Sequence, residues 1–69
     1  MSAAKQQELQ AFTDEVNRLS RLRCDAINAK GDRLFKAVHT DFPTGMMQFY
    51  VREGLTAQQA LDCIWVRSE

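Results

Sequence analysis

The side chains able to do acid–base or nucleophilic chemistry are few in this chain of 69 residues, and they are widely separated. His39 is the only imidazole, and Cys24 and Cys63 are the only thiols. General acid–base catalysis needs a positioned pair of titratable groups, and nucleophilic catalysis needs a nucleophile with a base within hydrogen-bond reach. The sequence spacing favours neither arrangement. We therefore expect His39 to be a lone surface or interface histidine and the protein not to be an enzyme.

Patterns that bind phosphates, cofactors or metals are also missing from the sequence. Gly31, Gly45 and Gly54 are too scattered to form a glycine-rich phosphate loop, and there is no CxxC or HxxxH spacing. The sequence thus assigns no catalytic, cofactor-binding or metal-binding residue.

Length and composition indicate one small domain over residues 1–69, a size at which a solitary core supplies only about 3 to 5 kcal/mol. Self-association is the simplest further source of stability. The chain lacks the pattern of a secretory signal and an apolar run of about 18 residues, so we expect a cytoplasmic protein with no membrane insertion. In that compartment both cysteines should stay reduced and pack as small apolar groups.

An apolar stripe with helical spacing runs through the first half of the chain and predicts a long amphipathic helix. Its members are Leu9, Phe12, Val16, Leu19, Ile27, Leu34, Val38 and Phe42. Pro43 disfavours a helical conformation at the residue before it, so we expect the helix to end around residues 40–42. The alternative is a break at Gly31, which could cap one helix while Asp32 begins another.

Two short helices should follow, over residues 45–53 and 57–66. Gly54 suits a left-handed C-terminal cap with Leu55 as its hydrophobic contact, and Thr56 with Gln59 fits a capping box. No strand-length alternation is present, so the sequence predicts an all-α fold with a long N-terminal helix followed by two short ones.

One chain of this design is too short to cover its own stripe, because a helix ending near residue 41 would span almost twice the length of the two short helices. We therefore expect a helical homodimer, the commonest way to cover such a surface, with its long helices antiparallel. Arg23 would interrupt the seam and set its register. The expected dimer interface consists of Leu9, Phe12, Val16, Leu19, Arg23 and Ile27.

Charge is segregated even though the formal net charge is zero. Residues 18–36 hold six basic and two acidic side chains, a local charge of +4, whereas residues 1–17 and 37–69 are each −2. Basic residues spread around a helix axis and diluted by acids attract phosphate weakly, and the last helix has no basic residue before Arg67. Nucleic acid is therefore not the favoured partner, although a small dimeric DNA-binding regulator remains the alternative.

The best candidate for a partner-binding surface is the segment 46–51, which is apolar nearly all round and needs burial on two sides. Methionine pairs adapt to irregular surfaces, and tyrosine is enriched at binding hot spots. The competing interpretation is that these side chains form the core. The predicted partner-binding residues are His39, Phe42, Met46, Met47 and Tyr50.

The chain resembles the small phage-encoded quorum-sensing anti-activator proteins, a group of host-factor inhibitors. The resemblance extends from MSAAKQQELQ to EGLTAQQALDCIW and consists of size, a long helix with a capped helical pair, and an acidic–basic–acidic charge order. It implies a helical dimer in the host cytoplasm that binds a LuxR-type transcription activator and prevents DNA binding, with a pilus-assembly ATPase as a second target. It transfers no site residue, because it includes no motif.

Overall fold

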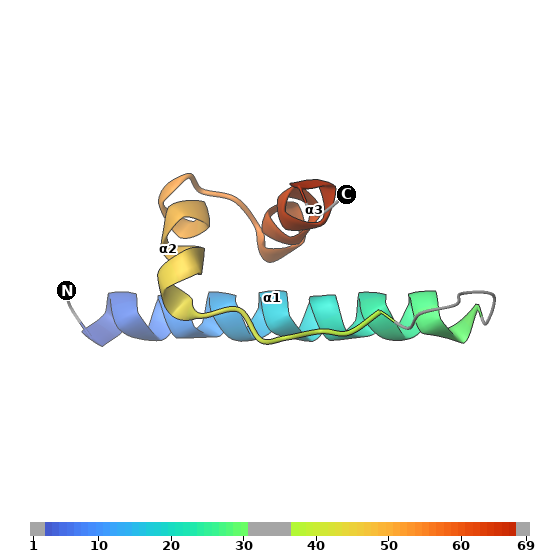
Figure 1. The fold of residues 1–69 in the computed structure, drawn as a ribbon. Coiled ribbons are helices and arrows are strands. Elements are labelled where there is room, and N and C mark those ends of the chain that lie inside the picture. Colours follow the sequence, from blue (N-terminus) through green and yellow to red (C-terminus); the bar gives the residue numbers. More distant parts are fainter. Residues whose placement is uncertain (1–2, 31–36, 68–69) are drawn as a thin grey trace.

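The part of the chain described by the computed structural model, residues 3–30 and 37–67, contains three helices and no strand. These are α1 (Ala3–Ala29), α2 (Thr44–Arg52) and α3 (Ala57–Arg67). The predicted all-α fold, with a long first helix and two short ones, is confirmed. Helices α2 and α3 lie on the same side of α1, and residues 37–43 run along α1 toward α2 (Figure 1).

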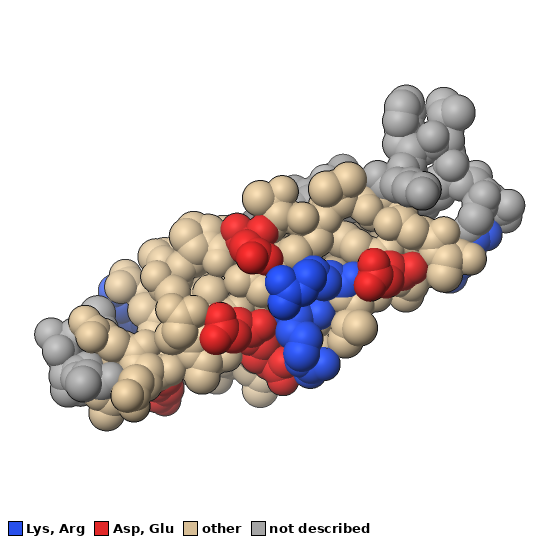
Figure 2. Space-filling view, turned by 90° about the horizontal axis from the view of Figure 1, so that it is seen from below, with Lys and Arg blue, Asp and Glu red and all other residues tan. Residues whose placement is uncertain are grey.

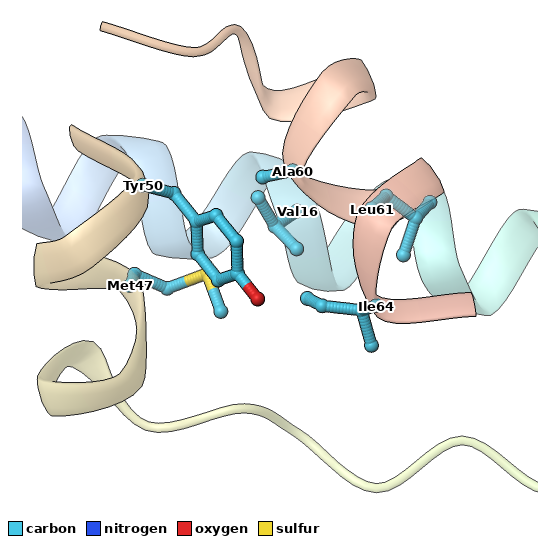
Figure 3. Close-up of a cluster of buried hydrophobic side chains, with 6 residues drawn as sticks. All are labelled: Val16, Met47, Tyr50, Ala60, Leu61 and Ile64. Atoms are coloured by element: carbon cyan, nitrogen blue, oxygen red, sulfur yellow. The ribbon is translucent and has the colours of Figure 1, made fainter. Parts of the chain in front are cut away.

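The core lies where α2 and α3 meet the apolar stripe of α1. Val16 is fully buried there, and Leu9, Phe12 and Leu19 pack around it. Side chains from α2 and α3 converge on Val16, with Met47 and Tyr50 on one side and Ile64 on the other (Figure 3). The buried cluster consists of Val16, Met47, Tyr50, Ala60, Leu61 and Ile64.

The first helix ends earlier than its apolar stripe. It stops at Ala29, and residues 37–43 have no helical structure, so the prediction of one helix reaching residues 40–42 is wrong. The competing prediction of a break at Gly31, with Asp32 opening a second helix, lies outside the described residues. Val38 and Phe42 share the helical spacing of the stripe but belong to an extended segment, so helical spacing alone did not define the helix.

One chain covers much of the stripe by itself, contrary to the length argument, because both short helices pack on the same side of α1. Val16 is part of the monomer core, so no second copy is needed to bury it. Arg23 hydrogen-bonds Asp62 of α3 and lies over the Trp65 ring, and Ile27 is half-buried. The stripe assigned to a dimer interface thus packs against its own chain from Leu9 to Arg23.

The turn between α2 and α3 forms as predicted. Gly54 has a φ of 75°, and its N–H donates to the Val51 carbonyl while the Leu55 N–H donates to the Tyr50 carbonyl. This pair of bonds is the Schellman motif. The Thr56 N–H then donates to Gln59 Oε1 at 2.9 Å, and the Gln59 N–H donates to Thr56 Oγ1 at 3.2 Å, which completes the capping box.

Pro43 marks the start of α2 rather than the end of α1. It occupies the N-cap position with φ −76° and ψ 156°, an extended conformation in which the missing N–H is harmless. Phe42 precedes the cap, packs against the core cluster and stands in the position that pairs with Met47 in a hydrophobic staple. The chain therefore enters α2 at a direction set by apolar packing.

Candidate protein-binding surface

A second stripe on α1, beside the apolar one, is made of small and polar residues. Its members are Thr13, Asn17, Ser20, Cys24 and Asn28. Thr13, Asn17 and Ser20 are buried, and Thr13 satisfies its hydroxyl within the helix by donating to the Leu9 carbonyl at 2.8 Å. Polar side chains are buried on this side because the return segment, residues 37–43, brings backbone groups that need hydrogen-bond partners.

Two asparagines hold the return segment by its backbone. Asn17 accepts from the Phe42 N–H at 2.7 Å and donates to the Phe42 carbonyl at 3.2 Å. Asn28 makes the same pair of bonds with Ala37, at 2.7 and 2.9 Å. Each amide thus satisfies both backbone groups of one residue. We call these two pairs of hydrogen bonds the clamps, and they fix both ends of the return segment on α1.

Between the clamps, His39 links the return segment to α1. Its Nδ1 lies 2.9 Å from Ser20 Oγ and its Nε2 lies 2.8 Å from Asp41 Oδ1, which also accepts from Arg21 at 3.2 Å. A carboxylate only accepts, so Nε2 carries the proton and, in the neutral ring, Nδ1 accepts from the Ser20 hydroxyl. Ser20 is 2% exposed. The linked groups tie the return segment to α1.

An apolar groove of about 390 Å³ lies between the return segment and α3, with part of α1 as its floor. Ser20 and Cys24 belong to α1, and Cys24 is a buried free thiol. Phe42 stands on one wall with its ring edge-on to His39, at a centroid distance of 5.5 Å. Trp65 belongs to the opposite wall, where the Arg23 guanidinium covers its ring at 5.5 Å. The residues lining the apolar groove are Ser20, Cys24, Ala37, Val38, His39, Thr40, Phe42, Ile64 and Trp65.

The predicted partner-binding residues fall into two groups. Met47 and Tyr50 belong to the core, so their assignment to an exposed surface is wrong; the inward face of α2 is the one that meets α1 and α3. His39 and Phe42 line the apolar groove, and Met46 is exposed on the outer face of α2. Binding of a partner by His39, Phe42 and Met46 stays a prediction.

Several residues of this surface were not predicted from the sequence. Val38 is 83% exposed at the groove, and Phe49 is half-exposed on α2. The sequence does contain a signal for the clamps. Asn17 and Asn28 lie on the same side of the helix as Ser20, and asparagine side chains readily hydrogen-bond backbone groups. No comparable signal marks Val38, whose exposure depends on the path of the return segment.

Basic residues of α1 lie close to acidic ones, as seen on the face of the molecule turned away from α2 and α3 (Figure 2). Arg18 pairs with Glu15 one turn away and lowers the pKa of that carboxyl by its hydrogen bond, while the pKa of Arg18 is raised. Arg23 donates to Asp62 at 2.8 Å and lowers the pKa of the Asp62 carboxyl. Much of the basic charge in this region is therefore balanced locally.

Comparison with protein-family models, curated proteins and solved structures found no match. No helix among the described residues is long and apolar enough to cross a bilayer. Within the same residues, no group of three or more histidine, cysteine or acidic side chains is placed to hold a metal ion.

Proposed function

We propose that this protein is a small protein-binding modulator that occupies a surface of a larger protein through the apolar groove. The observation that carries this proposal is the groove itself, whose walls present an aromatic ring from the return segment and another from α3, with the exposed Val38 beside them. Exposed apolar surface with a few fixed polar groups is typical of protein-interaction sites. The clamps on α1 hold this surface in place before a partner arrives.

The proposed target class is a LuxR-type transcription activator in the cytoplasm of a phage host, where the small protein would prevent DNA binding. The resemblance in size, helix order and charge order to phage quorum-sensing anti-activators supports this choice, and it adds a pilus-assembly ATPase as a second target. The proposal includes self-association into a homodimer, which would double the binding surface.

A DNA-binding regulator is the weaker alternative on the present geometry. Arg18, Arg21 and Arg23 each pair with an acidic side chain, and these pairs would have to open before the guanidinium groups could bind phosphate. Affinity for DNA rests largely on unpaired cations and falls steeply with salt. A protein interface centred on apolar contacts should respond less to salt.

The test uses a purified LuxR-type activator bound to its labelled DNA site, with this protein added in increasing amounts. Release of the DNA by the wild-type protein, with equal release by the Arg18→Gln variant, would support the proposal. Binding of the small protein to the DNA itself, with loss of that binding in Arg18→Gln, would favour the alternative. A DNA complex that stays intact would remove the LuxR-type target.

A further inference from the structure

The outer face of α2 presents an exposed apolar pair. Met46 is 39% exposed and Phe49 is 52% exposed, one helical turn apart. Glu53, at the C-cap of α2, is exposed and continues the same stripe one further turn along. We call Met46, Phe49 and Glu53 the outer α2 stripe.

The opposite end of α2 is its N-terminus. Pro43 at the N-cap makes no side-chain cap bond, and the first turn of α2 contains no acidic residue. The first N–H groups of a helix lack partners within the helix, and the helix dipole favours negative charge near them. An acidic group supplied from outside would meet both needs.

From these features we infer that the outer α2 stripe binds a second copy of this chain, with the two α2 helices antiparallel about a two-fold axis. In this arrangement Met46 packs against the partner's Phe49, and Glu53 reaches the N-terminal end of the partner's α2. Two-fold symmetry repeats both contacts. The inference rests on the self-association proposed above, but it is independent of what the apolar groove binds.

Self-complementarity is the reason for choosing a second copy as the occupant. The same stripe offers a carboxylate at one end and lies beside an uncapped helix N-terminus at the other, so an inverted copy matches charge as well as apolar surface. A parallel pair would instead bring the two Glu53 carboxylates together, which is repulsive. The contact is short, so the association should be weak, in the micromolar range or above.

Sedimentation equilibrium of the full chain tests the inference, since the monomer mass is 7.9 kDa. We expect the wild-type protein to dimerise and Phe49→Glu to raise the dissociation constant by at least about tenfold, as loss of an interface aromatic does. Leu22→Glu is the matched control, because Leu22 is also 52% exposed but lies on α1. It should dimerise as the wild type does.

Glu53→Lys separates folding from association. A cation at the C-terminal end of α2 favours its own helix, so the monomer should be at least as stable, whereas the dimer should weaken roughly threefold to tenfold because the new charge faces the partner's helix N-terminus. This variant keeps the test decisive if Phe49→Glu fails to fold.

Two different failures can be told apart. A wild-type chain that stays monomeric up to about 1 mM would overturn both the self-association and the stripe. A dimer weakened equally by Leu22→Glu and Phe49→Glu, or unaffected by Phe49→Glu and Glu53→Lys, would overturn the stripe alone. In a mixed labelled and unlabelled dimer, an isotope-filtered nuclear Overhauser effect between the Met46 methyl and the partner's Phe49 ring is the expected direct contact.

Discussion

At the scale of single residues, side-chain amides on α1 hydrogen-bond the backbone of the return segment, as a neighbouring strand does in a sheet. Asn17 satisfies both backbone groups of Phe42, and Asn28 satisfies both of Ala37. An extended segment lying on a helix cannot find these partners in the helix backbone, whose groups are already used. The path of the return segment therefore depends on a few polar side chains rather than on apolar spacing.

Asn17→Ala should lower the free energy of unfolding by roughly 1 to 3 kcal/mol, because it leaves the partly buried N–H and carbonyl of Phe42 without their side-chain partners. Urea unfolding followed by circular dichroism measures the change. Gln10→Ala is the control, since Gln10 makes an exposed bond to Asp14. Equal stability of the two variants would mean that water replaces the clamp at little cost.

The Arg23–Asp62 pair should make stability depend on pH in the acidic range. Arg23 lowers the pKa of Asp62 below its ordinary value of 3.8, so the unfolded chain takes up this proton first as pH falls. The pair's contribution is therefore fully present above that value and is lost as pH falls through the lower folded pKa. Urea unfolding between about pH 6 and about pH 3 should show a steeper loss for wild type than for Asp62→Asn. Parallel losses would show that the pair does not contribute.

At the scale of elements, the ends of the short helices were the most predictable feature. Gly54, Thr56 and Gln59 each have a local role that neighbouring residues alone define, and all of them act as expected. The end of α1 was not predictable in this way. Val38 and Phe42 keep the phase of the stripe, yet they reach the α3 side of α1 from an extended segment, and a periodic pattern does not distinguish the two routes.

Two glycines of the α2 region should respond to alanine with opposite signs. Gly54 has a positive φ, so Gly54→Ala should destabilise the protein by about 1 to 2 kcal/mol through strain. An added Cβ at Gly45 meets no atom within 4 Å, and Gly45 lies in the first turn of α2, so Gly45→Ala should stabilise by roughly 0.4 to 1 kcal/mol. Thermal unfolding of both variants gives the comparison. Stabilisation by Gly54→Ala would contradict the Schellman cap.

At the scale of the whole molecule, segment 46–51 was predicted to bind a partner, with core packing as the alternative. Met47 and Tyr50 are buried, whereas Met46 and Phe49 are exposed. Apolar residues all round α2 predict burial on two sides, but they do not say which side meets the same chain. The position of α3 determines which side of α2 is buried, because α3 folds back so that Met47 and Tyr50 face it across Val16 (Figure 3). A long-range contact of this kind is not visible in local spacing, which is why the partner-binding assignment included core residues.

Adjacent methionines offer a direct check of this division. Met47 is fully buried and Met46 is 39% exposed. Met47→Ala should cost about 2 to 5 kcal/mol, much of the stability of a domain this small, whereas Met46→Ala should change the free energy of unfolding by less than about 1 kcal/mol. Chemical denaturation of both variants measures the contrast. A larger loss for Met46→Ala would reverse the assigned orientation of α2.

Affinity capture from host lysate with three forms of the tagged protein tests the proposed function most directly. Bound material is treated with nuclease, washed at low and high salt, and quantified by mass spectrometry. The wild-type protein and Leu22→Glu, altered on α1 away from the apolar groove, should retain the same discrete protein, while Val38→Glu, which places a charge beside the groove, should lose it. Recovery that disappears with nuclease or salt, or that survives Val38→Glu unchanged, would contradict binding of a protein partner through the apolar groove.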